Sequence, residues 1–115
     1  MSRALKPVTI LRRARALIAN PRKWIKGAYT GRIKGRGIGY CALGALNVAA
    51  GCQVDDQIVT KTNRVNEQAR FRAYLILGRV AGVRHLPKWN DDPGTTHAQV
   101  LAAFDAAIAL VRKAA

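Results

Sequence analysis

The sequence predicts a mainly α-helical fold: a compact, single-domain bundle of about four helices with a Gly/Arg-rich basic loop or small hairpin. Apolar residues recur at the period of an amphipathic helix in the first and last thirds of the chain. Residues 41–50 are apolar on every side except at Asn47, as in a buried helix. Five glycines alternate with basic residues in residues 27–39, which favours a loop or a loose hairpin. A chain of 115 residues holds one core, so we expect residues 1–115 to form one domain.

The first helix is expected to begin at Thr9, whose hydroxyl can cap it. It is expected to end before Asn20 and Pro21, because a proline restricts the residue that precedes it. Pro21 is then expected to open a short second helix that runs through Trp24. Three basic side chains lie outside the apolar arc of the first helix and should face solvent. They are Arg12, Arg13 and Arg15.

Two helices are predicted in the second half of the chain. One runs from about residue 66 to residue 80, and its apolar residues spread over two faces, so we expect it to contact neighbours on two sides. The last helix is the clearest, because Thr96 and Gln99 match a capping box and an apolar face follows through four turns. His97 belongs to that apolar face.

The connecting segments of the second half give weaker patterns. Residues 53–62 are polar, show no clear period and are expected to be irregular. Residues 85–94 are rich in turn-forming residues around one aromatic anchor, Trp89, and are expected to form a loop.

Positive charge is concentrated in the first half of the chain. Lys and Arg number 20 against 6 Asp and Glu, and the formal net charge is +14. The half formed by residues 1–54 contains no acidic residue, whereas residues 55–115 contain both signs. A surface of one sign repels itself and destabilises the compact state, so we expect an anionic partner to compensate it. The expected function is nucleic-acid binding, to DNA or RNA, without catalysis.

Three segments supply the cations of this expected interface: the first helix, the turn at residues 22–26 and the glycine-rich loop. Glycine lets a backbone approach phosphates closely, and alternate residues of an extended segment point the same way. Two aromatic side chains, Trp24 and Tyr29, are expected to stack on bases. The expected phosphate-binding residues are Arg12, Arg13, Arg15, Arg22, Lys23, Lys26, Arg32, Lys34 and Arg36.

An acidic host protein is the main alternative partner, docked by the same basic face of a small phage or mobile-element adaptor or inhibitor. Membrane binding is not expected, because few bulky apolar residues accompany the charges and no apolar run approaches the roughly 20 residues that cross a bilayer. Arginines interrupt the apolar part of the N-terminus, which argues against a secretory signal. Cys41 and Cys52 lie in apolar surroundings and fit reduced core thiols, so a cytoplasmic location is expected.

A Cys-His hydrolase is the enzymatic alternative. Cys41 at a helix start, followed by Asn90, Asp91 and His97, has the order of such enzymes, and a helix N-terminus lowers the pKa of a thiol. Against it, Cys41 and His97 both belong to apolar faces, where packing residues are the rule. No metal or cofactor is expected, because the Cys and His spacings match no structural zinc site and the glycine-rich loop lacks a Gly-Lys-Ser/Thr ending.

A DNA-reading alternative comes from residues 46–53, which are similar to the Ala-x-x-x-Gly turn of a helix-turn-helix motif. The next segment would then be a recognition helix. Asp55 and Asp56 would face the phosphates from that helix, and their repulsion disfavours this alternative.

Two segments carry a family resemblance: Tyr40-Cys41-Ala42-Leu43-Gly44-Ala45-Leu46, and Trp89-Asn90-Asp91 followed by Thr96-His97-Ala98-Gln99-Val100-Leu101. In both, the chain resembles a family of small bacterial and phage proteins known only as a domain of unknown function. The resemblance implies one compact, cytosolic, mostly helical domain and adds no information about activity. Asn90 and Asp91 are expected to form a structural clasp on the free N–H groups of the Thr96 helix or the Cys41 helix. A polar pocket formed by Asn90, Asp91 and His97 is the alternative.

Overall fold

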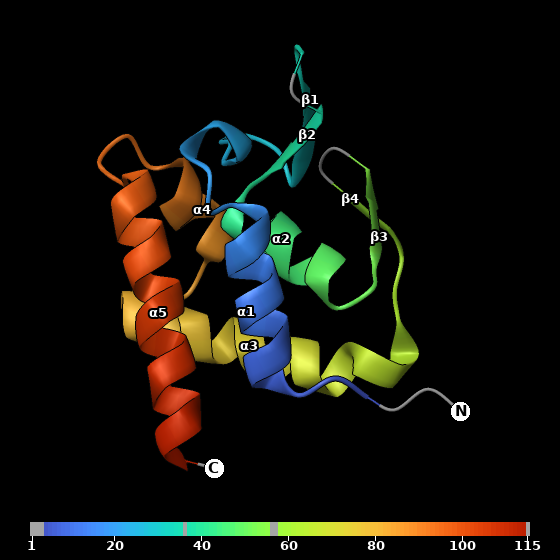
Figure 1. Cartoon of the computed structure of the whole chain (residues 1–115), viewed down its shortest axis with the longest axis vertical. Coiled ribbons are helices and arrows are strands. Elements are labelled where there is room, and N and C mark those ends of the chain that lie inside the picture. Colours follow the sequence, from blue (N-terminus) through green and yellow to red (C-terminus); the bar gives the residue numbers. More distant parts are fainter. Residues whose placement is uncertain (1–3, 36, 56–57, 115) are drawn as a thin grey trace.

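The computed structural model of the chain describes residues 4–35, 37–55 and 58–114 (Figure 1). Its α-helices are α1 (Pro7–Leu17), α2 (Ala42–Ala49), α3 (Glu67–Ala81), α4 (Leu86–Asp91) and α5 (His97–Ala114). Its strands are β1 (Thr30–Ile33), β2 (Gly37–Tyr40), β3 (Gln53–Asp55) and β4 (Ile58–Lys61). Two 3-10 turns, η1 (Pro21–Lys23) and η2 (Arg64–Asn66), complete the order. The mainly helical prediction is confirmed, but two small antiparallel sheets make the fold more than a helix bundle.

Helix α2 lies at the centre of the domain and packs against α1, α3 and α4. It is apolar on every side except at Asn47, as predicted, and all but one of its residues are buried. Cys41 caps its N-terminus, with Sγ accepting a hydrogen bond of 3.3 Å from the N–H of Gly44. Gly51, at a φ of 88°, supplies a left-handed stop after this helix.

Helix α1 packs across α2, α3 and α5 through Ile10, Leu11 and Ala14. The expected cap at Thr9 is wrong: the helix begins two residues earlier, at Pro7. A proline suits the first helical position because its φ is already helical and its missing N–H would have no partner there. The expected end is confirmed, since η1 follows directly from Pro21.

An irregular segment was expected at residues 53–62, but β3 and β4 pair there as a second antiparallel sheet. The β-branched run Ile58-Val59-Thr60 favours a strand, and its short length hid the period-2 pattern. Because a strand follows α2, the helix-turn-helix alternative is also wrong: no recognition helix follows the turn.

Residues 85–94 contain a short helix, α4, where a loop was expected. His85 caps it, with Nδ1 accepting a 3.1 Å hydrogen bond from the N–H of Lys88, and Pro87 lies in its first turn. Turn-forming residues are equally suited to capping a short helix, so composition alone did not distinguish a loop from a short helix.

Among the described residues, helix α3 buries one face against α1, α2 and α5, where contacts on two faces were expected. Its buried residues are Ala69, Ala73, Leu77 and Gly78, whereas Phe71 and Leu75 are 53% and 50% exposed. The second apolar face of α3 is therefore open to solvent.

Among the described residues, no helix is both long enough and apolar enough to span a bilayer.

Candidate nucleic-acid interface

The glycine-rich segment forms an antiparallel hairpin, β1–β2, that projects from one end of the domain (Figure 1). Thr30 pairs with Tyr40 and Arg32 pairs with Ile38. Arg32 and Lys34 were expected to point the same way from one strand. Lys34 instead lies in the turn, so the two side chains do not share a strand face. Arg36, the third cation assigned to this segment, lies outside the described residues.

The base of the hairpin is fixed to α2 and to the segment after η1. The N–H of Cys41 donates to the carbonyl of Tyr29 at 3.1 Å, and the N–H of Ile25 donates to the carbonyl of Tyr40 at 3.0 Å. Gly44 makes this approach possible, because a Cβ at that position would overlap the carbonyl oxygen of Tyr29. The hairpin is therefore held in place at its base while its far end extends into solvent.

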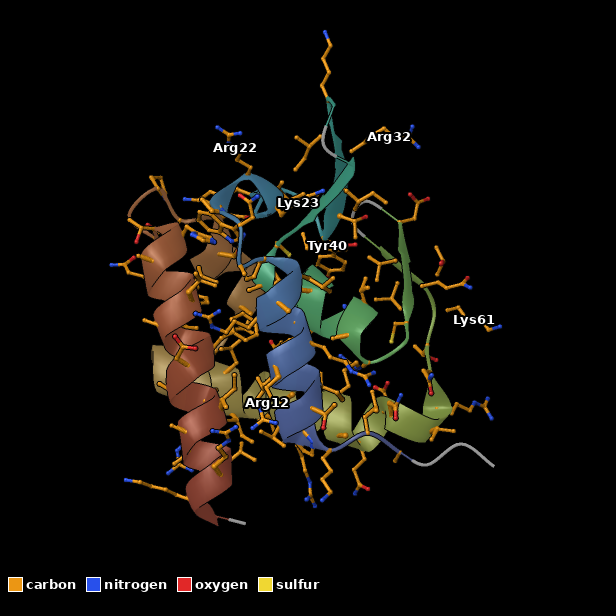
Figure 2. The ribbon with its side chains drawn as sticks, viewed as in Figure 1. Arg12, Arg22, Lys23, Arg32, Tyr40 and Lys61 are labelled. Carbon is orange, nitrogen blue, oxygen red and sulfur yellow. The ribbon has the colours of Figure 1, made fainter. Side chains whose placement is uncertain are left out.

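Several of the expected phosphate-binding side chains are exposed and have no hydrogen-bond or ion-pair partner among the described residues. Arg22 follows the Asn20 cap of η1, whose Oδ1 accepts the backbone N–H of Arg22 at 3.0 Å. Figure 2 shows Arg22 and Arg32 extending outward at the end where the hairpin projects, with Arg12 on α1. The members of this set are Arg12, Arg13, Arg22, Arg32 and Lys34. Lys23, also in the expected set, is half-buried in η1.

Arg15 and Lys26, both in the expected phosphate-binding set, have partners within the protein. Nε of Arg15 donates to Oδ1 of Asp105 at 2.6 Å, and this ion pair joins α1 to α5. Nζ of Lys26 donates to the carbonyls of Asp92 and Thr95 at 2.7 and 3.0 Å and lies 5.3 Å from the centre of the Trp24 ring. Arg15 and Lys26 therefore hold segments of the fold together, a role that spacing along the sequence did not reveal.

The two aromatic side chains expected to stack on bases are both packed into the fold. Nε1 of Trp24 donates to Oδ1 of Asn90 at 2.6 Å, and the Trp24 ring lies 5.8 Å from that of His97. Tyr29 is half-buried against the core. We assign no base stacking to either side chain.

Lys61 is an exposed cation that the sequence analysis missed. It ends β4, opposite Gln53 in β3, and it points outward on the second sheet (Figure 2). The signal for it is the β-branched run that precedes it, which places Lys61 in a strand rather than in an irregular segment.

Asn90 occupies the centre of a buried hydrogen-bond network that joins three segments. Its Oδ1 accepts from Nε1 of Trp24 and from the backbone N–H of Ala42 at 3.0 Å, and its Nδ2 donates to the carbonyl of Ile25 at 3.0 Å. Asp91 accepts the backbone N–H of Gly27 at 2.9 Å. The clasp geometry thus engages the N-terminus of α2, one of the two helices expected.

The N-terminus of α5 is capped by its own residues instead. The N–H of Thr96 donates to Oε1 of Gln99 at 2.9 Å, and the N–H of Gln99 donates to Oγ1 of Thr96 at 3.2 Å. This is the capping box that the sequence predicts. His97 follows it, with Nε2 lying 2.6 Å from the carbonyl oxygen of Ile18. Because a carbonyl can only accept, Nε2 carries the proton in this contact.

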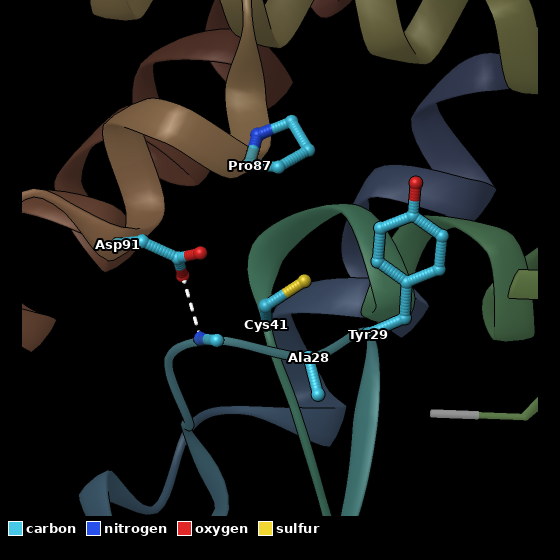
Figure 3. A pocket seen from close by; sticks show the side chains of 6 residues that line it. Ala28, Tyr29, Cys41, Pro87 and Asp91 are labelled. Carbon is cyan, nitrogen blue, oxygen red and sulfur yellow. Dashed lines mark hydrogen bonds between the residues drawn. The ribbon is translucent and has the colours of Figure 1, made fainter. Parts of the chain in front are cut away.

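Asn90, Asp91 and His97 do not line a common pocket. Asp91 lines a cavity of about 180 Å³ together with Cys41, Tyr29 and Pro87 (Figure 3). Asn90 does not line this cavity, although its Nδ2 donates to Oδ1 of Asp91 at 3.0 Å, and Nε2 of His97 lies against the carbonyl of Ile18 instead. Trp89 packs, half-buried, against the core.

The surroundings of Cys41 favour the neutral thiol over the thiolate that a Cys-His hydrolase uses. Burial raises the pKa of the Cys41 thiol, the nearby Asp91 carboxylate raises the pKa further, and the hydrogen bond from Gly44 only partly opposes them. An activated thiolate needs a lowered pKa. The ring nitrogen Nε2 of His97 is meanwhile engaged with Ile18 rather than with a thiol.

Comparison with known proteins gives a family and no activity. No curated protein and no solved structure matches the chain. The model of a family of unknown function, DUF6197, matches residues 2–110, a range that includes the hairpin, the Asn90 network and the Cys41 cap. The chain therefore belongs to this family of unknown function.

Proposed function

We propose that the protein binds nucleic acid without catalysis, contacting phosphates through the end of the domain that carries the β1–β2 hairpin. One observation supports this proposal above the others. Arg22, Arg32 and Lys34 are exposed at or next to a projecting hairpin, and their side chains have no partner among the described residues. They belong to a half of the chain that contains no acidic residue.

The shape of the hairpin suits a duplex groove. A two-stranded β-ribbon fits the major groove of B-DNA, which is about 12 Å wide. Ile38 pairs with Arg32 and is 49% exposed, so it adds an apolar contact for base edges beside the cation. Arg12 on α1 extends the phosphate contacts away from the hairpin. Such contacts position a protein on nucleic acid with little sequence preference.

The salt dependence of binding tests this proposal. If Arg12, Arg22, Arg32 and Lys34 each neutralise one phosphate, the logarithm of affinity for duplex DNA should fall with the logarithm of salt at a slope of about −3.6. Fluorescence anisotropy with labelled duplex, single-stranded DNA and RNA measures the slope and ranks the polymers. Affinity no greater than that of a scrambled basic peptide of equal charge would contradict the proposal. A partner that survives nuclease in a pull-down would favour the acidic-protein alternative instead.

A further inference from the structure

A groove with a volume of about 570 Å³ lies between the start of α1, the middle of α3 and the end of α5. Its floor is apolar and includes Val8, Ile76, Leu110 and Val111. Leu110 is 42% exposed, so the groove is open to solvent along α5. Figure 1 shows these three segments at the end of the domain opposite the β1–β2 hairpin.

Further exposed apolar side chains lie on α3, beyond the arginines that line this groove. On a helix, residues three and four positions apart are neighbours, which places Leu75 beside Arg72 and Arg79 and places Phe71 beside Leu75. Phe71 and Leu75 are both about half exposed. The stretch from Phe71 to Arg79 covers about 12 Å along the helix axis. This is the second apolar face of α3, for which the sequence predicts a neighbour and the described residues supply none.

The rim of the groove is positively charged. Lys6, Arg72 and Arg79 line it, and no acidic residue does. All three side chains are exposed, and none forms a hydrogen bond or ion pair with a described residue. An apolar floor between unpaired cations complements a ligand that is apolar on one side and anionic beside it.

We propose that the α3–α5 surface, defined by Phe71, Arg72, Leu75, Ile76, Arg79 and Leu110, docks an acidic amphipathic helix of a partner protein. Apolar side chains of such a helix at positions i, i+3 and i+7 fill the groove and cover Leu75 and Phe71. Its flanking carboxylates pair with Lys6, Arg72 and Arg79. The surface is separate from the hairpin, so the domain can hold an acidic protein and a nucleic acid at its two ends.

Two other occupants fit the surface less well. A second copy of this chain, related by a two-fold axis, would bring the same three cations against themselves, with no carboxylate in the lining to compensate them. A single anionic lipid tail would fill the groove but leave Phe71 and Leu75 exposed on the adjoining part of α3.

The test uses a synthetic helical peptide of roughly 18 residues, five turns, with Leu at i, i+3, i+4 and i+7 positions and Glu at most others. The control peptide has the same composition in an order that forms no apolar stripe. We expect the striped peptide to bind at least about tenfold more tightly in anisotropy titrations, because only it presents Leu side chains on one face. Equal binding of the two peptides would overturn the proposal, since it would mean that charge alone drives association.

Two double variants locate the contact. L75S/L110S should weaken striped-peptide binding about tenfold without unfolding the protein, because both side chains are largely exposed. R72Q/R79Q should weaken it about fivefold at low salt. The matched control R32Q/K34Q removes the same charge from the hairpin and should leave peptide affinity within about twofold. An equal loss in this control would overturn the assignment to the α3–α5 surface.

Two measurements address the rival occupants. A concentration-dependent dimer in light scattering that L75S/L110S abolishes would identify a second copy as the occupant and overturn the proposal. Displacement of the striped peptide by dodecanoate below its micelle concentration, with tighter binding of the fatty acid, would overturn it in favour of a lipid. Duplex binding by L75S/L110S should remain unchanged, so failure of this proposal is distinguishable from failure of the nucleic-acid proposal.

Discussion

The indole Nε1 of Trp24 donates a hydrogen bond of 2.6 Å to Oδ1 of Asn90. The same oxygen accepts the backbone N–H of Ala42 at the start of α2, and the amide nitrogen of Asn90 donates to Ile25, just before the hairpin. One fully buried side chain on α4 therefore ties the centre of the core to the segment that carries the proposed interface. Asn90, which belongs to a segment that carries the family resemblance, therefore holds these segments together through the hydrogen bonds of its side chain.

Replacing Asn90 by Ala should strongly destabilise the fold. The Asn90→Ala substitution leaves the indole N–H, the Ala42 N–H and the Ile25 carbonyl without their partner, for which we expect a loss of about 3 kcal/mol in the free energy of unfolding. Urea denaturation at neutral pH measures it. Asn20→Ala is the control, because Asn20 is exposed and only caps η1, with an expected loss of about 1 kcal/mol or less. Equal losses at both positions would contradict the central role of Asn90.

Replacing Gly44 by Ala should also destabilise the protein, contrary to the usual effect in a helix. Ala normally stabilises a helix interior by about 1 kcal/mol relative to Gly. Here the added Cβ would overlap the carbonyl of Tyr29 and push the hairpin base away from α2, so we expect a net loss of about 2 kcal/mol. A rise in the melting temperature of Gly44→Ala would show that the two segments do not pack this closely.

The buried thiol of Cys41 should make stability fall at alkaline pH. Because the pKa of Cys41 is raised in the folded state, its stabilising contribution is complete below the unfolded thiol pKa of about 8.5 and is lost as pH rises through the folded pKa. Cys41→Ser keeps a capping acceptor but does not ionise. We expect the free energy of unfolding of the wild type to decline more steeply above about pH 8.5 than that of the variant.

The same thiol should resist alkylation in the folded protein. In a Cys52→Ala background, iodoacetamide should label Cys41 only as fast as the protein unfolds. Rapid labelling of folded protein at neutral pH would contradict the raised pKa and would revive the hydrolase alternative.

Arg15 and Arg22 should behave differently although both were expected to contact phosphates. Arg15→Gln removes the ion pair with Asp105, which is largely exposed, so we expect a stability loss of about 0.5 kcal/mol and an unchanged salt slope for duplex binding. Arg22→Gln should leave stability unchanged and flatten the slope by about 0.9. A flattened slope for Arg15→Gln would return that residue to the interface.

The sequence was sufficient where one local rule determined the structure. The apolar residues of 41–50 predicted the buried helix α2, and Thr96 with Gln99 predicted the start of α5. The glycine pattern predicted a loop or a loose hairpin, and the structure has the hairpin. The prediction that the arginines of the first helix face solvent was correct for Arg12 and Arg13. It failed at Arg15, because Asp105 is 90 positions away along the chain and the ion pair depends on how α1 packs against α5.

The remaining features depend on contacts that no local pattern encodes. Trp24 looked available for stacking, but its partner Asn90 lies on a different helix. Strands β3 and β4 are too short for alternation to be recognised, and α4 is built from residues that also form turns. The two apolar faces of α3 were seen in the sequence, yet only the fold distinguishes the buried face from the exposed one.

The most direct test of the proposed function is a salt series of duplex-DNA anisotropy for the wild type and two double variants of equal charge. R32Q/K34Q removes two hairpin cations and should flatten the slope by about 1.8 from the wild-type value of about −3.6. R72Q/R79Q removes two cations from the opposite end and should leave the slope within error of the wild type. Equal flattening by both variants would mean that binding follows net charge rather than the hairpin, and would contradict the proposed interface.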